Sequence, residues 1–325
     1  PGRTVALRAD IDALPLTEEN DIPYRSKRSG VMHACGHDAH AAILLGVADV
    51  LAAMRDELSG RVRFLFQPAE EAGTNSGAPR MIEEGALDGV DAIGGLHVWS
   101  PLPAGTVGLR SGPVMASADI WDLTVQGKGG HSAMPHRTVD PTITASLVVT
   151  ALQTVVSREM DPLDTVVLSV GTMESGTAVN IIPGTARVAG SIRTLNPDVR
   201  SRMEGIVKRV ADGICSAMRA TAQLTFTHIY PVTVNDPALT EVMRAVAVDV
   251  AGEENVKEVS VAMGSEDFSY YGEKVPATLF FLGIADAAKG TDQQHHNPRF
   301  NAGDDVLGTG VAILAAFAVK VASGQ

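Results

Sequence analysis

Short apolar segments alternate with helical segments along the first hundred residues, and this alternation restricts the fold more than any other feature. Residues 4–9, 61–67 and 91–99 have the apolar, β-branched and aromatic composition of strands buried in a sheet. Between the first two, residues 37–54 place apolar side chains at helical spacing, and Asp38 is placed to cap the start of that helix. Strands that alternate with helices predict an α/β domain built on a mainly parallel sheet.

A different pattern begins near Met115. Residues 120–125 alternate polar and apolar side chains, and a long helical segment follows over 141–160. Strand patterns at 165–170 and 185–194, a helix over 197–219 and a strand at 222–228 complete the order βαββαβ. This order predicts an α+β module of the ferredoxin-like type.

The pattern from Pro231 onward is again that of an α/β domain, and an apolar helix over 306–321 closes it. We therefore expect residues 115–229 to form a domain inserted into a larger one. The larger domain would consist of residues 1–114 and residues 230–325.

The composition of the 325 residues excludes several classes of protein. Apolar residues make up 45% of the chain, which is enough for buried cores, and 38 acidic against 26 basic residues give a net charge of −12. That charge disfavours binding to nucleic acid or to an anionic membrane surface. The longest uninterrupted apolar run, residues 310–319, is too short to cross a bilayer.

The two cysteines, Cys35 and Cys215, are too few for a disulfide framework, and no signal peptide is recognisable, so we expect a cytoplasmic protein. The chain begins with Pro-Gly-Arg, which has the character of a turn, and enters the first predicted strand at once. From this start we expect that a segment preceding the strand is absent.

The densest chemical signal lies between His33 and His40, where three histidines, one cysteine and one aspartate occur within eight residues. Cys35 and His37 stand on either side of a glycine where a loop meets the predicted helix, so both side chains can reach one centre. A thiolate together with an imidazole suits a borderline-soft divalent metal ion.

Carboxylate or imidazole side chains also follow three predicted strands: Asp10 and Asp12, then Glu70 and Glu71, then His97. The carboxyl ends of parallel strands lie at one edge of a sheet, where binding residues gather. His295 and His296 occur in a loop before the final helix, and one of them would complete a metal site. No HExxH motif is present, so such a site must be assembled from distant segments.

Together these segments resemble the amidohydrolase branch of the M20 metallopeptidase family. The resemblance rests on nine blocks that occur in order along the chain: LRADIDALPL, MHACGHDAH, FQPAEE, GLHVW, GKGGHSAMPH, GTAVNIIP, GSIRT, GSEDFSYY and HHNPRFN. The branch includes hippurate hydrolases, N-acyl-amino-acid hydrolases, plant auxin-conjugate hydrolases and N-acetyldiaminopimelate deacetylases. The resemblance implies a metal-dependent hydrolase that cleaves the amide bond of an N-acyl amino acid.

The family also implies a site for two divalent metal ions. The ligands would be Cys35, which bridges the ions, with His37, Glu71, His97 and His296. Glu70 would be the general base, because Glu71 is held on the metal and two successive side chains cannot both face one ion. Asp12 would support a ligand from outside the metal site, whereas Asp10 and His295 are not expected to be ligands. The branch points to Mn²⁺, with Zn²⁺, Co²⁺ and Ni²⁺ as alternatives.

In this family the inserted module is a lid and dimerisation domain, so the resemblance implies a homodimer. His131 would stabilise the oxyanion of the tetrahedral intermediate. Asn180 and Arg193 match positions that line the substrate cleft, and Arg193 could pair with a substrate carboxylate.

Other functions stay open beside this one. An N-acetyldiaminopimelate deacetylase or a dipeptidase of the same family would share the site and differ in the shape of the acyl pocket. A catalytically silent metal-binding fragment is a further alternative, although Glu70 and a full ligand set speak against it. Thiol redox chemistry at Cys35 is disfavoured, because no second cysteine lies nearby to resolve a sulfenic acid. In each hydrolase case the binding partner is a small molecule.

Overall fold

The computed structural model describes residues 2–324, and Pro1, the first residue of the expected opening turn, lies outside them. The described chain forms two compact units. The first unit runs to Val114, resumes over Thr233–Val261 and continues from Asp267, and the second comprises Met115–Val232 and Ala262–Glu266.

The short segment Ala262–Glu266 differs from the expected division of the chain, which assigned it to residues 230–325. It belongs to the second unit because the backbone N–H of Ala116 donates to the carbonyl oxygens of Ala262 and Gly264, at 3.0 and 2.9 Å. Residues 230–232 are likewise part of the second unit.

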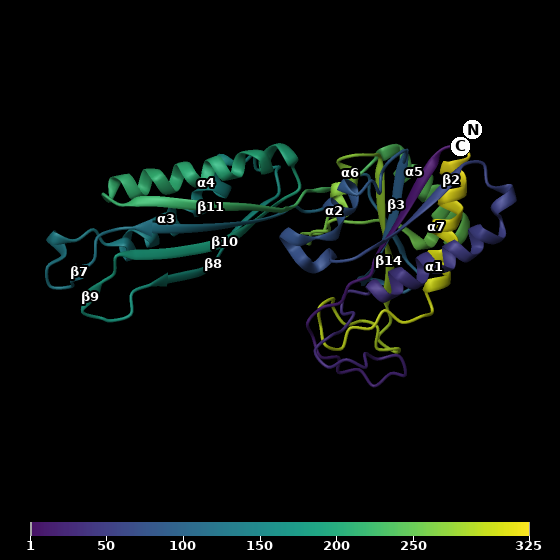
Figure 1. The fold of residues 1–325 in the computed structure, drawn as a ribbon, viewed down its shortest axis with the longest axis horizontal. Coiled ribbons are helices and arrows are strands. Elements are labelled where there is room, and N and C mark those ends of the chain that lie inside the picture. The colour runs from purple at the N-terminus through teal and green to yellow at the C-terminus, as the bar shows by residue number, and fades with distance from the viewer. Residues whose placement is uncertain (1, 325) are drawn as a thin grey trace. The chain divides into compact units, whose positions relative to one another are not determined.

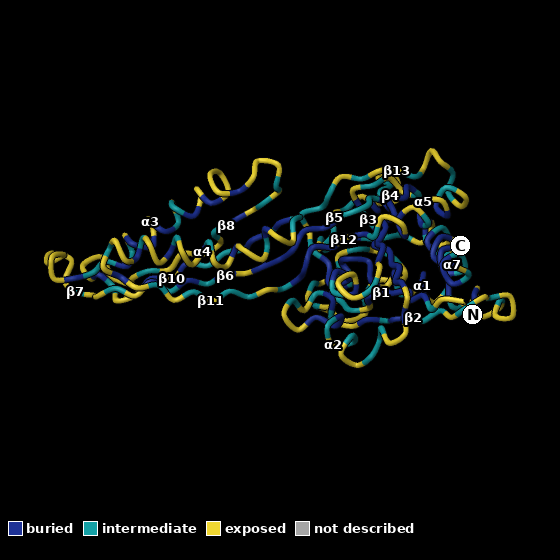
Figure 2. Tube along the Cα trace, turned by 90° about the horizontal axis from the view of Figure 1, so that it is seen from above, coloured by how far each residue is buried: buried dark blue, intermediate teal, exposed yellow. Residues whose placement is uncertain are grey.

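The first unit is built on a six-stranded sheet with the order β13–β4–β14–β3–β1–β2 (Figure 1). Its strands are β1 (Thr4–Asp10), β2 (Arg61–Gln67), β3 (Ala92–Pro103), β4 (Val107–Leu109), β13 (Val256–Glu258) and β14 (Ala277–Ala285). All its pairs are parallel except β14 with β4. β1 and β3 are dark blue over most of their length in Figure 2, as expected of strands covered on both faces. The predicted mainly parallel sheet is therefore confirmed.

Five helices belong to the first unit: α1 (His37–Ala53), α2 (Gly77–Glu83), α5 (Pro237–Ala251), α6 (Ser269–Gly272) and α7 (Leu307–Ala322). Figure 1 shows α1, α5 and α7 on one side of the sheet, where their apolar side chains join those of the strands in one core. α7 packs closely because β3 has a glycine at its crossing: a Cβ on Gly94 would lie 2.5 Å from the ring of Phe317. Asp38 does not cap α1 as expected, since the N-cap residue is Gly36 and Asp38 lies in the first turn.

The second unit has a four-stranded antiparallel sheet with the order β11–β6–β10–β8. Its strands are β6 (Ala118–Gln126), β8 (Val166–Ser175), β10 (Thr185–Thr194) and β11 (Thr221–Tyr230), and its helices are α3 (Pro141–Thr154) and α4 (Pro197–Ala217). Buried and more exposed residues alternate along β6, so one face of the sheet packs with both helices around Trp121. In chain order the elements are βαββαβ.

Shorter elements complete the two units. β5 (Gly112–Met115) pairs with β12 (Thr233–Asn235), and β7 (Gly130–His131) pairs with β9 (Ile181–Ile182). Short helical segments occur at Arg55–Glu57, Glu70–Asn75, Pro135–Arg137, Val155–Glu159 and Glu253–Asn255. Between residues 2 and 324 no helix has both the length and the apolar character needed to span a membrane.

Candidate metal centre

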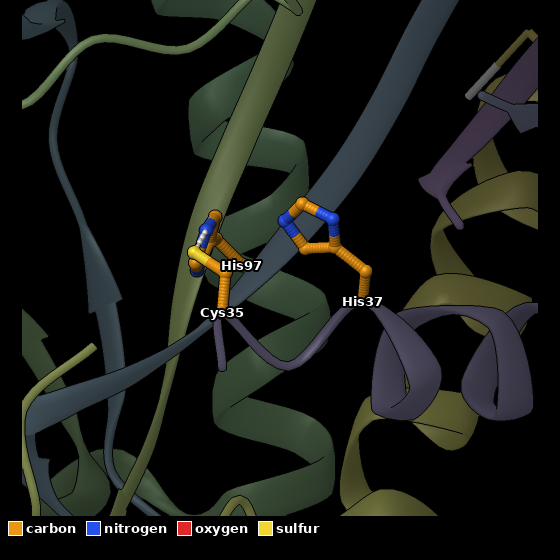
Figure 3. Close-up of side chains that lie close together, drawn as sticks. All are labelled: Cys35, His37 and His97. Atoms are coloured by element: carbon orange, nitrogen blue, oxygen red, sulfur yellow. Dashed lines mark hydrogen bonds between the residues drawn. The ribbon is translucent and has the colours of Figure 1, made fainter. Parts of the chain in front are cut away.

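A left-handed glycine places two candidate metal ligands at the start of α1. Gly36 has a φ of 85°, and a Cβ at this position would lie 2.3 Å from Val98 Cγ2, so only glycine fits here without displacement. Figure 3 shows Cys35 and His37 on either side of this turn, with His97 reaching them from β3. Cys35 Sγ lies 3.5 Å from His97 Nε2.

Three overlapping groups of possible ligand atoms lie at this edge of the sheet. Within each group all ligand atoms are within 4.8 Å of one another: Cys35, His37 and His97; Cys35, Glu71 and His296; His37, Glu70 and Glu71. Cys35 is common to two of the groups and His37 to two. The structure thus brings together all five sequence-predicted ligands and the predicted base, from segments that are far apart in the chain.

The two adjacent glutamates have different surroundings. They follow Ala69, whose φ of 60° is left-handed, and they open a helical turn directly after β2. Glu70 is buried and its Oε1 accepts the backbone N–H of Asp267 at 3.4 Å. Glu71 Oε1 lies 3.1 Å from His296 Nε2. The two successive carboxylates therefore have different partners, although both lie near His37 in one group of ligand atoms.

Asp12 contacts two of these residues without lying in any of the three groups. Its Oδ1 accepts from His37 Nδ1 at 3.1 Å and its Oδ2 accepts the backbone N–H of Glu71 at 3.0 Å. A proton on Nδ1 leaves the Nε2 lone pair of His37 directed toward the centre. Burial raises the pKa of Asp12, but these hydrogen bonds outweigh it and the pKa is lowered.

His97 is held in the matching tautomer. Its Nδ1 donates to the carbonyl oxygen of Val98 at 2.6 Å, so Nε2 keeps a lone pair on the side of Cys35. Burial lowers the pKa of His97 well below its ordinary value, which keeps the ring neutral. A neutral imidazole is the form that binds a metal ion.

The two histidines of the C-terminal loop differ in their contacts. His296 has a left-handed φ of 63°, donates its backbone N–H to Ala34 O at 2.7 Å, and extends to Glu71, whose carboxylate raises the pKa of the imidazole. His295 has both ring nitrogens engaged, Nε2 with Val98 O at 2.9 Å and Nδ1 with Ser100 Oγ at 3.2 Å. Burial lowers the pKa of His295 to about 4.

The residues fit a divalent metal centre. One thiol, three imidazoles and carboxylates converge there, and this is the donor chemistry of zinc, manganese and related ions. The buried Glu71 Oε1 accepts no aligned hydrogen bond from the described residues, although His296 Nε2 is at ion-pair distance. An ion between the two atoms would satisfy both.

Three further predicted site residues lie in the second unit. His131 is exposed on β7, and the Ser132 N–H donates to Asn180 O at 3.1 Å, so His131 and Asn180 are close. Arg193 lies near the other end of β10 from the β7–β9 pair, about 27 Å along the strand from Thr185. Its Nη1 donates to Met263 O at 3.1 Å and to Ser265 Oγ at 3.3 Å.

Sequence reasoning missed a group of buried residues next to the centre: Arg8, Gln67, Asp267, His40 and, as a partner, Asp10. The available signal was an arginine within an otherwise apolar strand, since a charged side chain is buried only when it is paired. His40 Nδ1 and Asp10 Oδ1 are 2.5 Å apart. Burial raises the pKa of Asp10, but Arg8 and His40 outweigh it and hold the pKa well below its usual value.

Comparison with known proteins places the chain in a family. The model of peptidase family M20/M25/M40 matches residues 6–320. Thermostable carboxypeptidase 1 of Saccharolobus solfataricus is 42% identical over 98% of this chain and 81% of its own length. N-acetyl-L-cysteine deacetylase of Bacillus subtilis is 43% identical over 92% of this chain and 70% of its own length.

A solved structure supports the same relation. The YxeP protein of Bacillus subtilis, described as a dinuclear metal-binding peptidase of the M20 family, superposes with a TM-score of 0.87 at 33% identity. The match covers all of this chain and 82% of that protein. The expected resemblance is therefore confirmed, and the chain belongs to the M20/M25/M40 family of metal-dependent hydrolases.

Proposed function

We propose that this protein is a metal-dependent amidohydrolase that cleaves N-acyl amino acids into a carboxylic acid and a free amino acid. The observation that carries the proposal is the division of the glutamate pair. Both carboxylates lie near His37, but Glu71 also lies with Cys35 and His296 in a second group of ligand atoms, whereas the buried Glu70 accepts a backbone N–H.

Two divalent ions would be held by five ligands: Cys35, His37, Glu71, His97 and His296. When bound, the ions supply a water of lowered pKa and polarise the amide carbonyl. Manganese is the expected metal, and zinc, cobalt or nickel suit the same donors.

Glu70 takes a proton from the attacking water and returns it to the leaving amine. Its carboxylate lies within 4.8 Å of ligand atoms of His37 and Glu71, and this supports the role, because a general base must lie within hydrogen-bond reach of its proton. Glu71 is unsuited to the role, since its carboxylate would be engaged as a ligand. Asp12 keeps His37 in the ligand tautomer.

His131 stabilises the oxyanion that forms on the substrate carbonyl. The backbone N–H of Ala133 donates to His131 Nδ1 at 3.0 Å, so a neutral ring carries its proton on Nε2. The exposed Nε2–H is then free to donate to a developing negative charge. Asn180, which lies beside it, and Arg193, which pairs with the substrate carboxylate, complete the proposed substrate contacts.

The second unit would act as the lid and as the surface through which two chains form a homodimer. About 27 Å of strand separates the β7–β9 end of this unit from Arg193, which is longer than a small N-acyl amino acid. One chain therefore cannot bring His131 and Arg193 to the same substrate, and in the proposed homodimer the two residues would come from different chains.

The substrate class rests on the relatives. The name of one relative describes removal of the acetyl group from N-acetyl-L-cysteine, and that of another describes a carboxypeptidase. We therefore place N-acyl amino acids first, with N-acetyldiaminopimelate or dipeptides as alternatives. Neither Cys35 nor Cys215 forms a disulfide bond, which supports a reducing compartment, the cytoplasm.

Amine release from a substrate panel tests the proposal. Metal-stripped protein with and without added Mn²⁺ would receive hippurate, N-acetyl amino acids, N-acetyldiaminopimelate, an indole-acetyl amino acid and a dipeptide. We expect Mn²⁺-dependent turnover that falls about 10²–10⁴-fold in Glu70→Ala and is unchanged in Glu84→Ala, a control whose side chain is 64% exposed. Normal turnover in Glu70→Ala, or none with any substrate at full metal occupancy, would contradict it.

A further inference from the structure

A buried arginine joins three segments at the edge of the sheet that carries the metal centre. Arg8 lies in β1 and is 2% exposed. Its Nη1 donates to Asp10 Oδ2 at 2.7 Å, its Nη2 to Asp267 Oδ1 at 2.7 Å, and its Nε to Gln67 Oε1 at 2.9 Å. Two buried carboxylates thus share one guanidinium, whose planar fork suits such paired contacts.

One branch of this network leads to the candidate ligands. Asp10 Oδ1 accepts from His40 Nδ1 at 2.5 Å, and Asp10 Oδ2 lies 3.6 Å from His37 Nε2. His40 Nε2 accepts the backbone N–H of Val98 at 2.9 Å. Since a backbone N–H can only donate, His40 is a neutral ring with its proton on Nδ1. The contact with Val98 holds the segment of β3 that carries His97.

The other branch leads to the proposed general base. The carboxylate of Asp267 accepts from Arg8 and also from Gln67 Nε2, which lies 2.7 Å from Oδ2. The backbone N–H of Asp267 donates to Glu70 Oε1 at 3.4 Å. The position of this N–H therefore depends on the bonds that hold the Asp267 side chain.

Asp10, His37 and His40 form a further group whose ligand atoms lie within 4.8 Å of one another. The hydrogen bonds argue against a metal ion there. His40 uses both ring nitrogens, on Asp10 and on Val98. Asp10 uses one oxygen on His40 and the other on Arg8. Binding an ion would break at least one of these buried hydrogen bonds.

We propose that Arg8 is a positioning residue for the metal centre, which holds the ligands through Asp10 and His40 and the general base through Asp267. Asp10 and His40 are then supports of the ligands and not ligands themselves. The inference rests on the proposed function, because it takes Glu70 as the base and His37 and His97 as ligands.

Cobalt binding tests this role without any substrate. Arg8→Lys keeps the charge but loses the planar fork that reaches three acceptors. We expect the folded variant to bind two Co²⁺ ions per chain, with the affinity for at least one lowered about 10–100-fold and a changed absorption spectrum. In the active protein the pH profile of kcat/KM should shift as well, because Glu70 loses its orientation.

The matched control is Arg200→Lys in the second unit. Arg200 holds the buried Asp119 through Nε at 3.0 Å and Nη2 at 2.8 Å, so its replacement disturbs a similar ion pair in the other unit. Its cobalt affinity should stay unchanged. A folded Arg8→Lys with the cobalt affinity and spectrum of the wild type overturns the proposal.

A second variant, Asp10→Asn, tests the proposal if Arg8→Lys does not fold. This substitution keeps the shape of the side chain. Two weakly bound Co²⁺ ions in this variant support a positioning role, and the loss of one ion makes Asp10 a ligand and overturns it. Wild-type protein that binds two Co²⁺ ions but hydrolyses nothing refutes the proposed function alone. Wild-type protein that binds no Co²⁺ refutes both.

Discussion

Replacing Gly36 by alanine should damage the metal centre through the backbone alone. Gly36 separates Cys35 from His37 with a φ of 85°, and a Cβ there would lie 2.3 Å from Val98 Cγ2. The left-handed conformation costs about 1–2 kcal/mol for a residue with a Cβ, and forcing a methyl group into a packed site costs about 1–3 kcal/mol. The free energy of unfolding should therefore fall by about 2–5 kcal/mol. Because Val98 directly follows the proposed ligand His97, displacing Val98 should also move His97 and weaken metal binding.

Gly30→Ala is the matched control for this substitution. Gly30 also has a left-handed φ, 76°, but a Cβ there would have no atom within 4 Å. Its cost should be the backbone part alone, about 1–2 kcal/mol, with unchanged metal binding. Urea unfolding of the metal-free variants and cobalt titration measure both quantities. Equal stability losses and equal cobalt affinities in the two variants would refute the reasoning.

Three other predictions follow from the packing, the assembly and the buried histidines. Phe317→Ala should lower the free energy of unfolding by about 3–5 kcal/mol in a thermal or urea melt, because the ring is fully buried against β3; Leu45→Ala, at a side chain 57% exposed, should change it by less than about 0.5 kcal/mol. The Glu70→Ala and His131→Ala variants should each be inactive alone. If the homodimer shares its sites, refolding the two variants together in equal amounts should restore about a quarter of wild-type turnover. No recovery would argue for sites within one chain. Protonation of His295 alone should cost the metal-free protein about 3 kcal/mol of stability between pH 6.5 and pH 4, because the unfolded chain protonates His295 at its usual pKa while burial lowers the folded pKa to about 4. His295→Gln should reduce the slope of stability against pH by this share, and an unchanged slope would exclude a contribution from His295.

The strands and helices that carry the site could be predicted because their apolar residues follow a clear period. The expected strand 61–67 is β2, Arg61–Gln67, and the expected helix 37–54 is α1, His37–Ala53. β4 and β13 were not predicted, because three residues are too few to show a period. Ala262–Glu266 was assigned to the wrong part of the chain because its membership depends on backbone hydrogen bonds to Ala116, which no side-chain pattern records.

The metal-ligating residues of the site could be predicted from the sequence, but the residues and backbone conformations that hold them in place could not. Cysteine, histidine and glutamate after strand ends indicate a metal centre by their chemistry alone. The left-handed backbone at Ala69 could not be read from residue type, since alanine rarely adopts this conformation. The role of Arg8 depends on which carboxylates surround it, and Asp267 is 259 positions away in the chain.

The division of labour between Glu70 and Glu71 is the central claim, and metal content measured beside turnover tests it most directly. Glu70→Ala should keep two ions per chain and lose turnover about 10²–10⁴-fold, because only the proton transfer is removed. Glu71→Ala should lose an ion, because its carboxylate lies with Cys35 and His296 among the ligand atoms. Loss of metal from Glu70→Ala with full metal content in Glu71→Ala would contradict the account.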